Sequence, residues 1–414
     1  MPATLSIEAK QLVFTRFTSC VDQHTQDLRG NHKTLHMAQW FQTVFGFAEG
    51  TSYGSNRSHF EYDEATATLR CGGRSFHVGS FTTPTVLELR EVVARHPPDS
   101  ATLGGITFKH LTNCNVASIL KDPKNQGAVV QAASQFNCLE MVGPGVTPEQ
   151  GISMYALDPT QGPQCAMSCA AGTAYRNYIH PDGRGQGGGD ARQVNTMRGV
   201  ERLLRNDAHQ YWTMRNGYLL PADSTKMAEL TERIGPHSSD VARRIVEHCA
   251  VGVHWDTEVA AASKHRVCQV YASATPVNYA KSTTSKDWSS LSCLILEAAY
   301  ELTLLAGAVL AAKENRRVTI YLTSVGGGAF ANRHEWIRAA IERALWTCRM
   351  YPLDVRMANF GGVVPSGYKT LVVPRAEPPF LIGGADHGKQ SPPPQEEEEP
   401  AAAADGGEQQ PAAE

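Results

Sequence analysis

Three consecutive glycines, Gly326 to Gly328, stand in the segment TSVGGGAFANRHEW (323–336), between an apolar run and an amphipathic run. The apolar run predicts a β-strand and the amphipathic run predicts a helix. A glycine loop between a strand and a helix N-terminus directs several backbone N–H groups and the positive end of the helix at one point, which suits an anion. The segment lacks the Gly-Lys-Ser/Thr ending of a nucleoside-triphosphate loop and the GxGxxG spacing of a dinucleotide-binding turn. A plain turn is the alternative, but Phe330 beside the glycines is placed to cover a sugar.

Polar side chains gather where a second buried strand is expected to end. The run VVQAASQFNCLEM (129–141) begins with apolar residues, and its polar members are Gln131, Ser134, Gln135, Asn137 and Glu140. Core packing does not explain amides at a strand end, whereas hydrogen bonds to ribose hydroxyls do. The sequence therefore predicts a ligand-binding cluster here, with Glu140 as its acidic member.

A turn further along the chain supplies another carboxylate. In the segment DPTQGP, Asp158, Thr160 and Gln161 precede Gly162 and Pro163, which open a helix of small residues. An aspartate in this position is explained either as a turn or helix N-terminal residue or as a carboxylate aimed into the cleft that holds Glu140. Both interpretations stay open on the residues alone.

Two other acidic groups favour structural roles. Asp256 and Glu258 follow an apolar run, and an acidic pair at a strand end is usually solvated rather than part of a site. Glu297 and Glu301 lie one turn apart on one face of an expected helix, which favours a paired helix face over a ligand-binding role.

Alternating strands and helices must position these residues. Helical spacing predicts helices over 238–250, 288–312 and 332–348, with Asn332 and Glu335 as a capping box, and strands are expected over 264–276, 316–325 and 351–360. A strand–helix–strand order predicts parallel crossovers and therefore an α/β fold, whose ligands bind at the carboxyl ends of the strands. Residues 1–110 are less regular and are expected to form an extension packed on this body. The glycine-rich run at 183–190 predicts a mobile surface loop.

Composition excludes some classes of function. The chain has 414 residues, a net charge of −3 and a pI near 6.6, so it lacks the basic surplus of a general nucleic-acid binder. The ten cysteines have no regular spacing, which favours reduced core thiols over a zinc site. No metal site is expected.

The two ends of the sequence and its longest apolar run bear on location. The N-terminus has no basic region followed by an apolar run, so no signal peptide is expected. The apolar stretch 291–312 is interrupted by glutamates and predicts a buried helix, not a membrane span. Residues 378–414 are rich in Pro, Glu and Ala and are expected to be disordered. We expect a soluble cytoplasmic protein, with a nuclear location also open.

The motifs together resemble those of macrodomains, the ADP-ribose-binding α/β family. The first site strand of that family ends in a V-N-A-A-N-like run, which corresponds here to residues 130–134 (VQAAS). A later strand ends in a glycine-rich diphosphate loop with an aromatic residue (SVGGGAF), and the last strand also ends in an aromatic residue (MANF). The residues of these motifs are most similar to those of a divergent branch that includes a Legionella effector acting on ADP-ribosylated ubiquitin and its eukaryotic relatives. The resemblance implies a three-layer α/β/α fold with a mixed central sheet over residues 111–377, between the extension (1–110) and the tail (378–414).

The resemblance also implies roles for individual residues. Gly326, Gly327, Gly328 and Ala329 would bind the diphosphate, Phe330 would pack on the distal ribose, and Phe360 would stack on adenine beside Asn359. The distal ribose would be held by Asn137, with further ligand contacts from Gln131, Ser134 and Gln161. Asp158 is the first choice for the catalytic carboxylate and Glu140 the second. No cofactor is implied.

The departures from the family pattern limit what carries over. Gln131 and Ser134 replace the usual asparagines, and the glycine-rich catalytic loop is absent after Glu140. Residues 111–377 also lack an adjacent Glu-Glu pair such as that of poly-ADP-ribose glycohydrolases. Three functions were weighed: a hydrolase that removes ADP-ribose from a protein, with arginine as the modified residue and ubiquitin as the carrier; a non-catalytic reader of ADP-ribose; and an unrelated nucleotide enzyme. Several carboxylates near an anionic ligand favour the hydrolase, with ADP-ribosylated protein as its partner and neither nucleic acid nor membrane.

Overall fold

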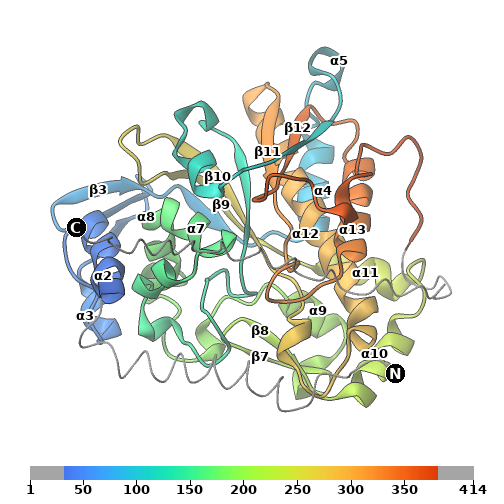
Figure 1. The fold of residues 1–414 in the computed structure, drawn as a ribbon, viewed down its shortest axis with the longest axis horizontal. Coiled ribbons are helices and arrows are strands. Elements are labelled where there is room, and N and C mark those ends of the chain that lie inside the picture. The colour runs from blue at the N-terminus through green and yellow to red at the C-terminus, as the bar shows by residue number, and fades with distance from the viewer. Residues whose placement is uncertain (1–31, 381–414) are drawn as a thin grey trace, which may run out of the picture. The chain divides into compact units, whose positions relative to one another are not determined.

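A seven-stranded mixed sheet forms the centre of the computed structural model, which describes residues 32–380 (Figure 1). Its strand order is β4-β9-β10-β6-β11-β12-β5. The five strands from β10 to β5 run parallel, whereas β9 and β4 are antiparallel to their neighbours. The strands of this sheet are β4 (Ser80–Thr82), β5 (Thr107–Leu111), β6 (Val129–Ala133), β9 (Gly252–Glu258), β10 (Arg266–Ala272), β11 (Val318–Leu322) and β12 (Leu353–Ala358).

Helices cover both faces of this sheet, because alternate strand residues point to opposite sides. Val129, Val270 and Ile320 pack into a cluster with α12 and α13, whereas their neighbours Val130, Tyr271 and Tyr321 pack with α6 and α7. The helices are α2 (His32–Phe45), α3 (Tyr53–Ser58), α4 (Val86–Arg95), α5 (Ser100–Leu103), α6 (Val116–Lys121), α7 (Gln161–Ser168), α8 (Ala170–Ala174), α9 (Arg198–Leu203), α10 (Ser224–Ile234), α11 (Asp240–His248), α12 (Ser285–Glu314) and α13 (His334–Thr347). The predicted three-layer α/β/α architecture with a mixed central sheet is confirmed.

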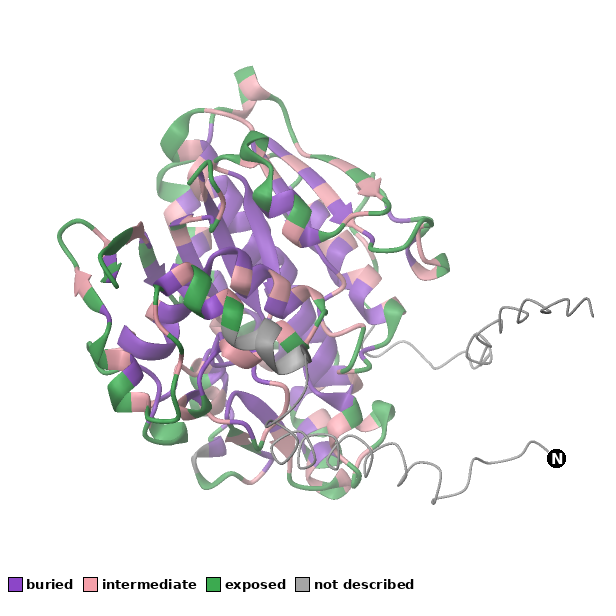
Figure 2. Cartoon of the chain, turned by 60° about the vertical axis from the view of Figure 1, so that its left-hand side comes forward, coloured by how far each residue is buried: buried purple, intermediate pink, exposed green. Residues whose placement is uncertain are grey.

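Buried residues, purple in Figure 2, fill the interior, and most residues of the longest helix, α12, are among the buried ones. It is long and apolar enough to cross a membrane by composition, yet 89% of its most apolar window is buried within the protein. A helix that is apolar all round must be covered on every side, and α4, α10, α11 and α13 surround it. The predicted buried helix over 288–312 is thus confirmed, with bounds extended at both ends.

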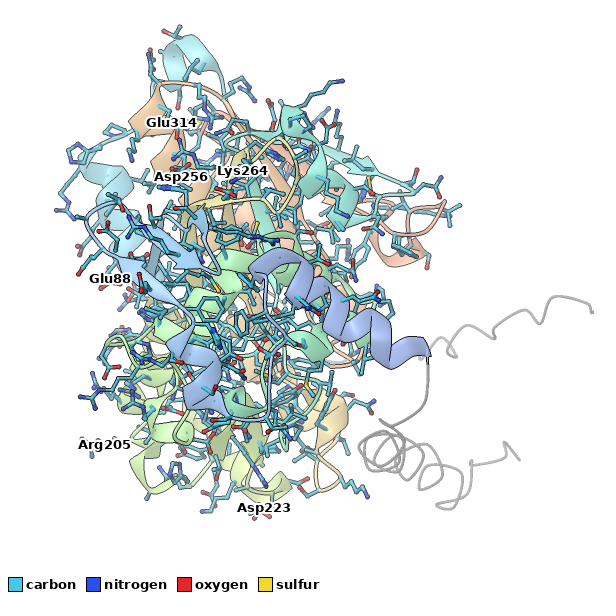
Figure 3. All side chains as sticks on the ribbon, turned by 90° about the vertical axis from the view of Figure 1, so that its left-hand side faces the viewer. Glu88, Arg205, Asp223, Asp256, Lys264 and Glu314 are labelled. Carbon is cyan, nitrogen blue, oxygen red and sulfur yellow. The ribbon has the colours of Figure 1, made fainter. Side chains whose placement is uncertain are left out.

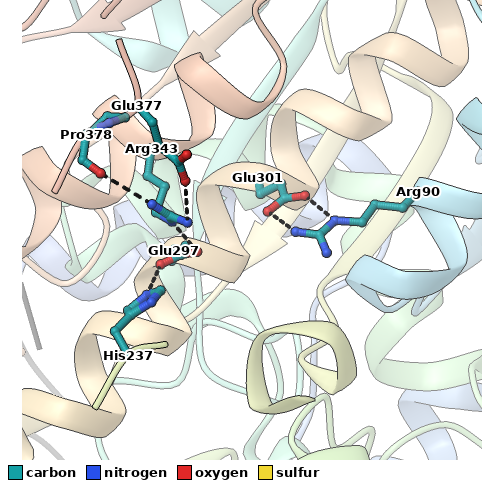
Figure 4. Close-up of polar contacts among 7 residues, drawn as sticks. All are labelled: Arg90, His237, Glu297, Glu301, Arg343, Glu377 and Pro378. Carbon is teal, nitrogen blue, oxygen red and sulfur yellow. Dashed lines mark hydrogen bonds and ion pairs between the residues drawn. The ribbon is translucent and has the colours of Figure 1, made fainter. Parts of the chain in front are cut away.

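Glu297 and Glu301 of α12 are paired, as expected. Glu301 accepts two hydrogen bonds from Arg90, at 2.6 and 2.9 Å, and Glu297 binds both His237 and Arg343 (Figure 4). Buried carboxylates need such partners, and here the partners join α12 to α4, α13 and the segment before α11. These residues hold helices together and lie outside the cavity described below.

The region before residue 110 has its own small core but also joins the central sheet. An antiparallel sheet of β1 (Glu61–Asp63), β2 (Thr68–Cys71) and β3 (Arg74–His77) packs with α2 and with residues 139–179. The carboxylate of Glu49 accepts hydrogen bonds from the backbone of Ile152 and Ser153 and from the hydroxyl of Tyr178. The division into an extension, a binding domain and a tail stays a prediction, but both edge strands of the central sheet, β4 and β5, come from around or before its first boundary.

Three local expectations differ from the structure. Arg333, not Asn332, precedes α13, because the Asn332 amide instead donates to the backbone oxygens of Thr275 and Gly326. The run 183–190 is not simply a surface loop, since Gln186 is fully buried and donates to the backbone of Asn137 and Arg176. A hairpin of β7 (Trp212–Arg215) and β8 (Tyr218–Pro221) was not expected. The tail predicted to be disordered, 378–414, lies outside the described residues except for 378–380.

The predicted thiol chemistry fits the structure. Every cysteine that the structure describes has a free thiol, and all except Cys114 are buried. Within residues 32–380 no group of three or more His, Cys, Asp or Glu side chains is arranged to hold a metal ion.

Candidate functional site

A cavity of about 900 Å³ opens at the carboxyl ends of β6, β11 and β12. Parallel sheets bind ligands at this edge, because the loops that follow neighbouring strands meet there. All the residues that the sequence singled out as catalytic or ligand-binding line the cavity except two, Gln131 and Asn137. Those that line it are Ser134, Glu140, Asp158, Gln161, Gly326, Gly327, Gly328, Ala329, Phe330, Asn359 and Phe360.

Gln131 and Asn137 lie behind the cavity wall, and both are fully buried. Gln131 donates to Thr303 on α12 and accepts from the backbone N–H of Thr323. Asn137 donates to Gln193 and accepts from the N–H of Leu139. The expected ligand contacts of these two amides are therefore corrected: their hydrogen bonds hold the strand end and the loop that form the site.

The glycine loop presents unpaired backbone donors to the cavity. Val325, Gly327, Ala331 and Asn332 donate their N–H groups within the protein. Within the described part of the chain, no protein acceptor is recorded for the N–H groups of Gly326, Gly328, Ala329 and Phe330. Gly328 and Ala329 are exposed and Gly326 and Phe330 are half-buried, so these N–H groups are open to solvent or to a ligand in the cavity. Several free donors in one loop before a helix N-terminus suit an anionic ligand.

The structural environment of the loop differs among the three glycine positions. Gly326 has φ +75°, and a Cβ there would lie 2.5 Å from Cβ of Ala274. A Cβ at Gly327 would lie 2.4 Å from Oγ of Ser324. Gly328 lines the cavity, has no positive φ, and a Cβ there would meet no protein atom within 4 Å. The fold thus requires glycine at 326, a side chain at 327 would have to displace the Ser324 hydroxyl, and 328 leaves space on the ligand side.

Phe330 is part of an aromatic wall of the cavity. Its ring lies 5.6 Å from the ring of Tyr218 and 5.5 Å from that of Tyr279, and the two tyrosine rings are 5.3 Å apart. Aromatic rings at this spacing make stable edge and tilted contacts. Tyr218 also donates to the backbone oxygen of Met141 at 2.6 Å, which fixes this wall next to the loop after β6 that carries Glu140.

Glu140 is a buried carboxyl group in the cavity wall. Its side chain is 5% exposed, and Oε1 has no hydrogen-bond partner in the described part of the chain. Burial raises the pKa of Glu140 well above its usual range; the charge of Arg176 opposes this shift and that of Asp158 adds to it. This shift favours the protonated form of Glu140, which suits a proton donor better than a base.

Gly162 lies close to the other oxygen of this carboxyl group. A Cβ at Gly162 would lie 2.3 Å from Oε2 of Glu140 and 2.4 Å from the backbone oxygen of Ala133. The Gly-Pro opening of α7 thus allows the helix to approach Glu140 and the end of β6 more closely than any side chain would permit.

Asp158 lies on the opposite edge, half-buried, in the turn before α7. Its Oδ1 accepts a hydrogen bond of 2.8 Å from the N–H of Thr160, and both residues line the cavity. Both interpretations left open by the sequence are therefore present at once: Asp158 is a turn residue, and its carboxylate is at the cleft. The pair of carboxyl groups has contrasting environments, one buried and one partly solvated, which is the arrangement that separates acid from base roles.

Arg176 is a buried guanidinium behind Glu140. It is fully buried and donates to the backbone oxygen of Cys138, to Thr173 and to Nδ1 of His254, and it lies 3.6 Å above the ring of Tyr271. Burial and the charge of Arg176 lower the pKa of His254 well below its usual range, so this imidazole is neutral and accepts the hydrogen bond. Sequence reasoning missed Arg176 because the residues that hold it come from distant segments.

The remaining predicted residues also line the cavity, and their polar groups form hydrogen bonds within the protein. The Gln161 side chain accepts from the N–H of Ala133 and donates to the backbone oxygen of Gln131, so it extends the edge of β6. Ser134 donates to the backbone oxygen of Gln135 at 2.9 Å. The Asn359 amide donates to the backbone of β5 and β12, whereas Phe360 is 79% exposed at the rim and free to stack on a base.

The structure adds lining residues that were not predicted. Thr323 is 6% exposed, and its Oγ1 has no hydrogen-bond partner in the described part of the chain. Tyr218 follows Asn216 and Gly217, whose positive φ angles belong to the tight turn between β7 and β8, so the Asn-Gly pair was a signal for this hairpin. Tyr279, His334 and Tyr368 come from loops and a helix end that carry no such signal.

Two acidic residues that the sequence assigned to solvent are indeed away from the cavity. Asp256 pairs with Arg266 at 2.8 Å and with His77 at 3.2 Å, and Glu258 lies 3.7 Å from Lys264. Asp256 and Lys264 are labelled near one another in Figure 3. Neither acidic residue lines the cavity.

Comparisons with known proteins give structural similarities only. No protein-family model matches the sequence, and no curated protein matches it. A variant of poly(ADP-ribose) glycohydrolase from Thermomonospora curvata is similar with a TM-score of 0.36 and 10% identity, over 81% of this chain and 95% of that one. The poly(ADP-ribose) glycohydrolase from Deinococcus radiodurans in complex with ADP-ribose is similar with a TM-score of 0.35 and 12% identity, over 70% of this chain and 91% of that one.

Proposed function

We propose that this chain is an ADP-ribosyl hydrolase that removes ADP-ribose from a modified protein. The observation that carries the proposal is one cavity that combines unpaired backbone donors at Gly326, Gly328 and Ala329 with two carboxyl groups in contrasting environments, Glu140 and Asp158. The macrodomain resemblance of the sequence implies the same activity. A plain phosphate-binding site would have no use for a buried carboxyl group with an unpaired oxygen.

The binding half of the proposal follows from the chemistry of the ligand. The diphosphate accepts hydrogen bonds from the loop N–H groups, and the adenine stacks on the exposed ring of Phe360 at the rim. The distal ribose lies against Phe330, in the part of the cavity that contains Glu140 and Asp158. Thr323, whose Oγ1 lacks a partner, lies where the loop begins and can bind a phosphate or ribose oxygen.

The chemical half assigns opposite roles to the two carboxyl groups. The bond between C1″ of the distal ribose and the protein breaks, and a water oxygen forms the new bond at C1″. Asp158 accepts the proton of that water and stabilises the positive charge that develops on the ribose. Glu140 gives its proton to the leaving nitrogen or oxygen, which its burial prepares it to do. One proton is thus taken up and one released in each cycle.

The finer proposal concerns the linkage. We propose arginine as the modified residue and ubiquitin as a carrier, as the resemblance implies. A guanidinium leaving group is cationic, and the rings of Tyr218, Tyr279 and Phe330 offer it aromatic faces. Asp158 lies close enough to Tyr279 that its charge contributes to raising the pKa of that phenol, which places an anion beside the same faces.

The experiment compares linkages on the full chain. Peptides or proteins carrying ADP-ribose on arginine, on serine and on a carboxylate are incubated with the wild type and with Asp158→Asn, and free ADP-ribose is followed. Release from at least one substrate, lost in Asp158→Asn, supports a hydrolase, and preference for arginine supports the finer proposal. Binding of ADP-ribose without release from any substrate identifies a reader instead.

A further inference from the structure

The cavity wall is poor in positive charge. Two carboxyl groups, Glu140 and Asp158, line it, and none of its described lining residues is a lysine or an arginine. His334, the first residue of α13, is the one described lining side chain able to carry a positive charge. A diphosphate bridge carries two negative charges, so the wall as a whole does not complement it except through backbone N–H groups and this imidazole.

Packing places His334 at the glycine loop. Its ring lies 5.1 Å from the ring of Tyr368, and a Cβ at Gly367 would lie 3.0 Å from Cβ of His334. The hydroxyl of Tyr368 shares a hydrogen bond with Oγ of Ser324. A Cβ at Gly327 would lie 2.4 Å from this Oγ of Ser324. Tyr368 thus contacts His334 through its ring and Ser324 at the start of the loop through its hydroxyl, and all these residues line the same cavity.

Independent features of the same wall indicate a ligand there. Oγ1 of Thr323 is buried without a partner in the described part of the chain, and the N–H groups of Gly328 and Ala329 lack protein acceptors. His334, the first residue of the fourteen-residue helix α13, lines the same cavity as these groups. Their unmet donors and the imidazole of His334 suit one acceptor-rich group better than separate ligands.

We propose that His334 binds the ligand's diphosphate directly, donating a hydrogen bond from its imidazole, and that it makes the site prefer a diphosphate over an uncharged nucleoside. This inference rests on the proposed function, since it names a contact to the diphosphate of ADP-ribose. Arg333 does not take this role: its side chain is 53% exposed, forms an ion pair with Glu335 and does not line the cavity.

The adjacent Arg333 provides a matched control. His334 and Arg333 are both exposed, both precede or begin α13, and both can be replaced without disturbing the core. A general effect of positive charge near the helix N-terminus would be removed by either substitution, whereas a direct contact would be removed only at His334.

The test is calorimetric titration of the full chain with ADP-ribose and with adenosine. We expect His334→Ala to weaken ADP-ribose binding about tenfold, the size of one hydrogen bond to a charged group, and to leave adenosine binding unchanged. His334→Gln, which keeps a donor without the charge, should lie between His334→Ala and the wild type, and Arg333→Ala should match the wild type. Unfolding curves of all variants verify that each is folded.

Different results overturn different statements. Equal ADP-ribose binding by the wild type and His334→Ala, or an equal loss in Arg333→Ala, refutes the role of His334 and leaves the proposed function intact. Equal loss of adenosine and ADP-ribose binding in His334→Ala also refutes a diphosphate contact. Failure of the wild type to bind ADP-ribose refutes the proposed function and this inference together.

Discussion

The substitution Gly328→Ala distinguishes an effect on protein stability from an effect on ligand binding. Gly328 lines the cavity, has no positive φ, and leaves a new Cβ without a protein atom within 4 Å. The protein should therefore accept the methyl group, whereas a phosphate that approaches the backbone N–H of Gly328 should not. This substitution tests the central feature of the site without altering any side chain that performs chemistry.

The expected magnitudes differ for folding and binding. The free energy of unfolding should change by less than about 1 kcal/mol, because the conformation is open to alanine and no contact is lost. Binding of ADP-ribose should weaken by about 1–3 kcal/mol, the usual cost of an extra methyl group in a closely packed contact. That range corresponds to about a 5- to 150-fold increase in Kd.

Two control variants accompany this measurement. Gly143→Ala makes the same substitution at a glycine that also has open space and does not line the cavity, so it should change neither stability nor Kd. Gly326→Ala should unfold at lower temperature, because Gly326 has φ +75° and its Cβ would lie 2.5 Å from that of Ala274. Calorimetry gives Kd, and thermal unfolding gives stability.

The reasoning would be refuted by wild-type affinity for ADP-ribose in a folded Gly328→Ala variant. That result would mean that the diphosphate does not approach this backbone. A large loss of stability in Gly328→Ala would instead contradict the packing on which the comparison depends.

The remaining predictions concern the carboxyl groups and their supports. Asp158→Asn should reduce ADP-ribose release at least about 100-fold and leave binding of free ADP-ribose, because the water loses its proton acceptor; equal rates in a release assay would remove Asp158 from the mechanism. Glu140→Gln should also abolish release, and it should change the pH dependence of stability. Burial raises the pKa of Glu140 in the folded protein. As the pH rises above about 4.3, this carboxyl group therefore ionises in the unfolded chain before it ionises in the folded one. The wild type loses stability over this range, until the pH passes the folded-state pKa of Glu140. Urea unfolding should therefore show wild type and Glu140→Gln diverging toward high pH, and parallel curves would contradict the burial argument. Gly162→Ala should cost about 1–3 kcal/mol of stability, since its Cβ would lie 2.3 Å from Oε2 of Glu140, and an unchanged melting temperature would argue against this close approach. Arg90→Met should lower the free energy of unfolding by about 2 kcal/mol, because it leaves Glu301 buried and unpaired. The loss is smaller than for a fully buried pair, since the Arg90 side chain is 39% exposed. Urea unfolding measures this change, and an unchanged stability would show that Glu301 finds another partner.

The long periodic elements were predictable from the sequence. The apolar run that forms α12, the three-and-four spacing of α13 and the short strand β11 have strong patterns, and each pattern matches the burial that the fold imposes on it. Since the order of these elements fixes where the carboxyl ends of the strands meet, the cavity with the glycine loop, Glu140 and Asp158 could be placed in advance.

The two residues that the structure moves out of the cavity show what the patterns leave open. Gln131 shares the alternation of Val129, so it points at α12 and not beyond the end of the strand. That the partner of Gln131 is Thr303 follows only from the way β6 packs against α12. Asn137 is buried because the turn at Gly217 covers it, and a Cβ at Gly217 would lie 2.5 Å from its side chain.

Residues contributed by distant loops were not predictable. Tyr279 and Tyr368 reach the cavity through contacts between segments far apart in the chain, and neither has a local signal. The buried Arg176 similarly depends on Cys138, Thr173 and His254, which the sequence does not associate. Edge strands β4 and β5 are short and exposed, so they lack the apolar runs that identified the central strands.

The most direct test of the proposed function follows free ADP-ribose released from an ADP-ribosylated arginine protein, with ADP-ribose binding measured on the same preparation of the full chain. The combination of loop, buried acid and partly solvated carboxylate predicts both binding and release, with release lost and binding kept in Asp158→Asn. Absence of ADP-ribose binding by the folded wild type would contradict the proposal at its foundation, and binding with no release from any linkage would contradict the assignment of Glu140 and Asp158 as catalytic residues.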